Sequence, residues 1–157
     1  MHRSVIHISL PPYIAAWLRF DSSSDPVRFR RSSVEFMILE QFCVNDPEKA
    51  PDDPVPENSV AVVVPEFKYK DSSYRFLPMA GRKALETCIK DRFNIKLWKG
   101  LNKFGHIGKQ RKDLILAWME ANGIPDEGSN WDSIEKRYQR QRNSYLAANR
   151  QKKARKK

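Results

Sequence analysis

The chain has 157 residues, a 40% share of hydrophobic residues and a formal net charge of +10 at pH 7, which together predict a folded and strongly basic protein. No stretch reaches the ~18 consecutive apolar residues of a membrane span, and no signal peptide is recognisable, so we expect no membrane partner and a cytoplasmic location. The two cysteines, Cys43 and Cys88, lie in apolar helical patterns, which favours buried thiols over a disulfide.

The first predicted element is a strand, because apolar and other residues alternate and place Ile6, Ile8 and Leu10 on one face. Two prolines end this strand and suit the start of a helix. A second helix follows, and Ser32 with Glu35 three residues later predicts a capping box at its beginning.

A proline- and acid-rich stretch then separates two parts of the chain. We expect a strand-helix-helix region at 1–44, a linker or extended surface loop at 45–58, and a strand followed by helices at 59–157. One compact domain formed by the whole chain is the alternative.

Apolar residues at helical spacing predict three more helices. The first begins near Pro78 and its pattern is interrupted at Gly100, and the second ends at Gly123, which suits a left-handed C-cap. The third begins at Ser129 or Asn130 and is long and basic. The predicted fold class is therefore α+β, mostly helical, with a short β-sheet and about five helices.

The last helix carries a narrow aromatic and aliphatic seam made of Trp131, Ile134, Tyr138, Tyr145 and Ala148. Their spacing places them on one face, which we expect to dock on the rest of the protein for about four turns. The remaining positions are rich in amides and in basic residues, namely Lys136, Arg137, Arg140, Arg142, Arg150, Lys152 and Lys153.

The charge is concentrated at this end of the chain. Residues 1–58 have 6 basic and 9 acidic side chains, residues 59–130 have 13 and 8, and residues 131–157 have 10 and 2. Arg, Lys, Gln and Asn bind phosphates and base edges, so the sequence predicts a nucleic-acid surface to which Lys109, Arg111 and Lys112 would add. The alternative is a solvated helix with a frayed basic tail.

The segment 3–44 has a predicted strand ending in SLPP, a helix, and a second helix that begins at SSVE. This order of elements resembles the ribbon-helix-helix DNA-binding proteins. That resemblance implies a homodimer whose paired strands enter the major groove of DNA. It also implies that Arg3, Val5, His7 and Ser9 face the groove and that Ser32 and Ser33 hold a phosphate. The rest of the chain resembles uncharacterised small basic bacterial proteins found near mobile elements.

Catalysis has little support in the sequence. The three histidines are scattered, no Cys or His pair has metal-ligand spacing, and no phosphate-binding glycine loop occurs. We therefore expect no catalytic residues, metal, cofactor or small-molecule substrate. The predicted function is non-catalytic nucleic-acid binding, with DNA as the favoured target and RNA as the alternative, in a regulator or accessory factor of a phage or mobile element. The alternative is a protein-interaction adaptor or structural component.

Overall fold

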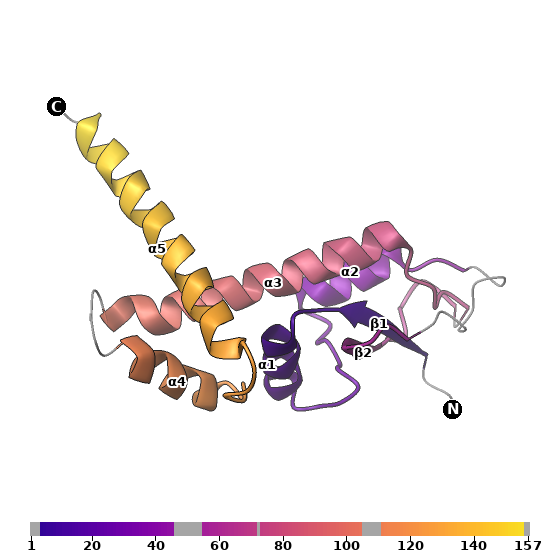
Figure 1. The fold of residues 1–157 in the computed structure, drawn as a ribbon. Coiled ribbons are helices and arrows are strands. Elements are labelled where there is room, and N and C mark those ends of the chain that lie inside the picture. Colours follow the sequence, from indigo (N-terminus) through magenta and orange to yellow (C-terminus); the bar gives the residue numbers. More distant parts are fainter. Residues whose placement is uncertain (1–3, 46–54, 72, 105–110, 156–157) are drawn as a thin grey trace. The chain divides into compact units, whose positions relative to one another are not determined.

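The computed structural model describes residues 4–45, 55–71, 73–104 and 111–155 (Figure 1). In chain order the elements are β1 (Val5–Ser9), α1 (Pro12–Ser22), α2 (Val34–Phe42), β2 (Ser59–Val63), α3 (Met79–Leu101), the 3-10 helix η1 (Asn102–Phe104), α4 (Arg111–Ala121) and α5 (Asn130–Ala154). The described residues thus contain five α-helices and a two-stranded antiparallel sheet. The predicted fold class, mostly helical α+β with a long last helix, is confirmed.

The chain forms two compact units, Met1–Arg92 and Phe93–Lys157, which are called unit 1 and unit 2 below. The boundary falls inside α3. The segments before and after the acidic stretch at 45–58 belong to the same unit, because β1 pairs with β2 and Val44 forms a bridge with Phe76. The structure therefore divides the chain within a helix, where sequence composition gives no sign of a boundary.

Unit 1 is organised around the pairing of β1 with β2, in which Val5 lies opposite Val63 and Ser9 opposite Ser59. Ile6 and Ile8 are buried while Val5 and Ser9 are exposed, which confirms the alternation predicted for the first strand. The buried residues of unit 1 come from the sheet, from α1, α2 and α3, and from the segments that connect them. The largest side chains that are fully buried are those of Trp17, Ile8, Ile14, Leu18, Leu39, Leu77, Leu85 and Ile89.

The start of α2 differs from the prediction. The N-cap is Ser33, whose hydroxyl accepts a hydrogen bond of 3.2 Å from the backbone N–H of Phe36, and Ser32 lies exposed one residue before it. The predicted capping box of Ser32 with Glu35 is therefore wrong. Glu35 is only 2% exposed, and its carboxylate pairs with Arg92 at 3.0 Å. A tertiary ion pair has taken the carboxylate that a local cap would have used.

Unit 2 consists of the second part of α3 together with η1, α4 and α5. The predicted interruption at Gly100 is wrong, since α3 continues to Leu101. The indole of Trp118 occupies the space that a Cβ at position 100 would fill, and its ring meets that of Phe93 edge-on at 5.7 Å. The glycine therefore allows close packing of α4 on α3. The other buried hydrophobic residues of this unit are Leu97, Leu101, Ile115, Met119, Ile124, Ile134 and Tyr138.

The end of α4 follows the prediction. Gly123 has a φ of 67°, which is the left-handed conformation that glycine adopts at no steric cost. The next backbone N–H, that of Ile124, donates to the carbonyl of Met119 at 3.0 Å, and Ile124 itself is buried. This turn closes α4 and begins the connection to α5.

Candidate nucleic-acid interface

The two units differ sharply in charge. Unit 1 contains 13 basic and 13 acidic residues, so its formal net charge is zero. Unit 2 contains 16 basic and 6 acidic residues, which accounts for the whole +10 of the chain. Because surface potential follows local rather than total charge, an anionic partner would be attracted to unit 2.

The first part of α5 is held firmly in unit 2. Ile134 and Tyr138 are buried, and the ring of Tyr138 lies 5.9 Å from that of Trp98 on α3. Ser129 is the N-cap but makes no side-chain cap bond, and the side-chain amide of Asn130 donates to the carbonyl of Pro125 at 3.1 Å. These contacts fix the position and direction of the helix within the unit.

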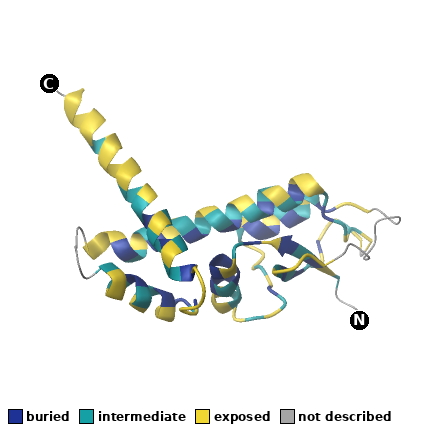
Figure 2. Cartoon of the chain, in the orientation of Figure 1, coloured by how far each residue is buried: buried dark blue, intermediate teal, exposed yellow. Residues whose placement is uncertain are grey.

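The second part of α5, residues 143–154, is called the distal half of the helix here. All its residues are exposed except the half-buried Asn149, as the colouring of these turns in Figure 2 makes visible. The predicted seam of four docked turns is therefore too long, since Tyr145 is 49% exposed and Ala148 is also exposed. Helical spacing identifies the face that docks, but it does not give the length of the surface that covers it.

Three of the predicted basic residues are half-buried in unit 2. Arg111 donates to Gln139 Oε1 at 2.7 Å, and Arg137 donates to Asn94 Oδ1 at 2.8 Å. Arg142 is half-buried, and its Nη1 is buried with no acceptor among the described residues. The hydrogen bonds of Arg111 and Arg137 support the packing of α5, and these two guanidinium groups are less available to an external phosphate.

The other predicted basic residues of α5 and α4 are open to solvent. They are Lys112, Lys136, Arg140, Arg150, Lys152 and Lys153, to which Arg155 is added by the structure. Lys136 and Arg140 are four residues apart and share one face, and the amide residue Asn143 follows on that face. Lys109 and Arg3 lie outside the described residues.

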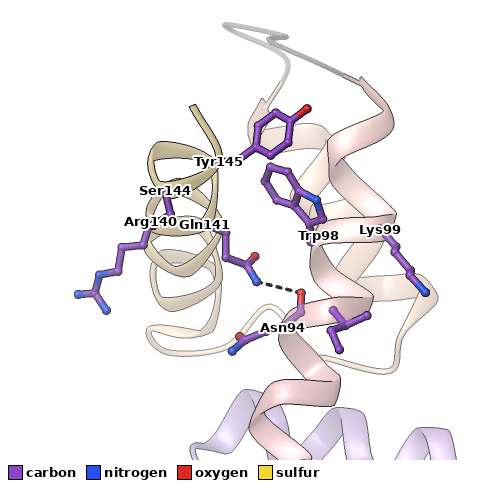
Figure 3. Close-up of a pocket in the computed structure, with 8 residues that line it drawn as sticks. Asn94, Trp98, Lys99, Arg140, Gln141, Ser144 and Tyr145 are labelled. Atoms are coloured by element: carbon purple, nitrogen blue, oxygen red, sulfur yellow. Dashed lines mark hydrogen bonds between the residues drawn. The ribbon is translucent and has the colours of Figure 1, made fainter. Parts of the chain in front are cut away.

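A notch opens beside this exposed surface, between α3 and α5 of unit 2 (Figure 3). It has a volume of about 530 Å³, and the rings of Trp98 and Tyr145 lie against it with their centroids 5.3 Å apart. Lys99 and Arg140 extend on opposite sides of it, and the side-chain amide of Gln141 donates to the backbone carbonyl of Asn94 at 2.9 Å. Sequence reasoning missed Trp98 and Lys99, although an aromatic beside a lysine in a basic segment was a visible signal.

The N-terminal positions predicted for DNA contact lie in unit 1. His7 is half-buried, with Nδ1 3.3 Å from the hydroxyl of Ser59. One edge of β1 pairs with β2, and on its other edge the N–H of Ser9 donates to Glu86 Oε1 at 3.1 Å and Arg82 Nη1 donates to the carbonyl of His7 at 3.4 Å. Pairing of β1 with the β1 of a second copy of the chain would have to displace these contacts. The ribbon-helix-helix dimer stays a prediction.

The described residues contain no cluster of three or more His, Cys, Asp or Glu side chains suited to a metal ion. Within the same residues, no helix combines the length and apolar character needed to cross a membrane. Comparison of the chain with family models, curated proteins and solved structures found no match. The charge and geometry described above are therefore the features that indicate a function.

Proposed function

We propose that this protein is a non-catalytic nucleic-acid-binding protein that contacts DNA, in preference to RNA, through the basic surface of unit 2. The observation that supports this most directly is the location of the charge, since unit 1 is neutral and unit 2 carries the full +10. A role as a regulator or accessory factor of a phage or mobile element belongs to the same proposal and comes from the sequence resemblance alone.

The composition of α5 favours a polyanion over simple solvation. A helix face that serves only solubility usually mixes charges of both signs. No acidic residue follows Glu135, whereas Arg150, Lys152 and Lys153 are all exposed on the distal half. Like charges so close together repel one another, and phosphate groups would relieve that repulsion while releasing the counterions condensed on the nucleic acid.

The test is a salt series of binding measurements on labelled duplex DNA and on duplex RNA of the same sequence. Each phosphate neutralised on B-DNA contributes about −0.9 to the slope of log K against log salt concentration. A variant with Arg150, Lys152, Lys153 and Arg155 changed to Gln keeps a helix-forming residue at every position. It should bind more weakly, with a slope that is smaller in magnitude by about 3 to 4.

The matched control removes the same charge from unit 1, by changing the exposed residues Arg28, Arg30, Arg31 and Lys83 to Gln. The salt slope of this control should stay close to that of the unchanged chain. If the control loses binding and the α5 variant keeps it, the interface lies in the strand-helix-helix region instead. If the unchanged chain does not bind at low salt, the proposal is wrong.

A second candidate function, as a protein-interaction adaptor, is supported by the surface of α2. Val34 is 58% exposed and Met37 is 55% exposed, and their spacing of three residues places these apolar side chains on one face. A variant with both residues changed to Ser should retain nucleic-acid binding under the main proposal. Two results together would support the adaptor function. The chain would not bind nucleic acid, and the backbone amides around Val34 and Met37 would be protected from hydrogen exchange in a purified complex with a protein partner.

A further inference from the structure

The notch between α3 and α5 is lined by two aromatic rings as well as by cations, and electrostatic attraction to a polyanion requires only the cations. We propose that it receives an unpaired base of a single-stranded nucleic acid, which stacks on Tyr145 and Trp98 while Lys99 and Arg140 hold the adjoining phosphates (Figure 3). This inference depends on the proposed function, because it names the form of nucleic acid that unit 2 binds.

The aromatic part of the site is both supported and open. Trp98 is backed by the buried ring of Tyr138 at 5.9 Å, so its position is fixed from one side. Tyr145 lies 5.3 Å from Trp98 but is tilted by 51° to it, so the two rings diverge instead of closing into a parallel stack. Tyr145 remains 49% exposed although it is one of the largest side chains of α5. Exposed aromatic rings of this kind provide stacking surfaces for bases.

The polar part of the site matches a phosphate-linked ligand. Lys99 and Arg140 are both exposed and extend on opposite sides of the notch, and none of its lining residues is acidic. Gln141 is fixed by its hydrogen bond to the carbonyl of Asn94, while its Oε1 has no donor among the described residues. Cations beside aromatic rings are the combination with which proteins follow a single strand.

Duplex DNA does not offer this contact, because its bases are stacked and paired and only their edges are accessible in the grooves. An apolar peptide could cover Ile95 and Tyr145, but it would leave the two flanking cations without anions. A volume of about 530 Å³ is within the usual range for small-ligand sites and leaves room for a flat ring. A single strand with unpaired bases satisfies both the rings and the cations.

The experiment compares two single-stranded oligonucleotides of equal length and charge, one of thymidine residues and one of abasic residues. Affinity is measured by fluorescence anisotropy with the full chain. We expect the thymidine strand to bind at least about five-fold more tightly, since stacking of one base is worth that much or more. Changing Tyr145 to Ala should bring the ratio of the two affinities close to one, while Tyr145→Phe should keep it.

The matched control is Leu146→Ala, which truncates the neighbouring exposed side chain of α5 outside the notch and should keep the preference for bases. As a second blocking variant, Ser144→Leu fills the notch without removing a ring, and it should abolish the preference. Circular dichroism establishes that each variant is folded.

The outcomes separate the two proposals. Equal and tight binding of both strands overturns the base site while nucleic-acid binding stands, and a preference for bases that survives both Tyr145→Ala and Ser144→Leu also overturns it. Failure to bind either strand, or duplex, at low salt overturns the proposed function and the base site with it.

Discussion

The ion pair between Arg92 and Glu35 holds a buried carboxylate in unit 1, so we expect its removal to destabilise this unit. Glu35 is 2% exposed, and its Oε1 lies 3.0 Å from Arg92 Nη1. The other terminal nitrogen of Arg92 reaches Asp21 at 3.1 Å, and its guanidinium lies over the ring of Trp17 at 5.0 Å. Changing Arg92 to Met keeps most of the aliphatic stem but leaves the Glu35 carboxylate buried without this cation.

The magnitude follows from burial. Removing one partner of a buried ion pair typically costs about 3–5 kcal/mol, because the other charge loses its compensation. The Arg92 side chain is itself 37% exposed, so solvent already screens part of the interaction. We therefore expect a loss of about 3 kcal/mol in the free energy of unfolding, at the lower end of that range.

Urea denaturation followed by circular dichroism measures the effect, which corresponds to a fall of about 1–3 M in the midpoint for unit 1. The double variant Glu35→Gln with Arg92→Met should be more stable than Arg92→Met alone, since a neutral amide is cheaper to bury than a carboxylate. Lys83→Met, an exposed change on the same helix, should stay within about 0.5 kcal/mol of the unchanged chain. The reasoning is refuted if Arg92→Met matches Lys83→Met, or if the double variant gains nothing over the single one.

Three further predictions test the packing. Burial raises the pKa of the Cys43 thiol to about 11, so at pH 8 iodoacetamide should alkylate Cys43 more slowly than the half-buried Cys88. Peptide mass spectrometry measures the two rates, and equal rates would contradict the burial of Cys43. Gly100→Ala should destabilise unit 2 by about 1–2 kcal/mol in thermal unfolding, because the clash with Trp118 outweighs the gain in helix propensity, and a stabilised variant would show that the indole moves aside. Ile134→Ala should cost about 2–5 kcal/mol in urea denaturation, and a loss under 1 kcal/mol would mean that α5 does not depend on this docked face.

The local features of the fold could be read from the residues because each has a short-range cause. Alternation set which face of β1 is buried, with Ile6 and Ile8 inward. The left-handed turn at Gly123 needed only a glycine after an apolar helical run. The same local logic gave the number of helices, since helical periodicity is a property of neighbouring residues.

Errors arose wherever a distant segment decided the outcome. Glu35 has the spacing of a capping residue but pairs with Arg92, which lies far along the chain. Gly100 has the composition of a helix interruption but serves as a contact point for Trp118. Tyr145 has the spacing of a docked seam residue but lies at the edge of the notch, because the covering surface ends near Trp98.

Composition and short-range spacing were enough to predict the helical and strand elements, and they place the excess of basic residues near the C-terminus, with no acid after Glu135. The packing of segments remote in sequence is what pairs Arg111 and Arg137 with acceptors inside unit 2 and brings Trp98 and Tyr145 together beside exposed basic groups. The physical reason is that burial and side-chain pairing depend on distances between segments that are remote in sequence, and local propensity carries no information about those distances.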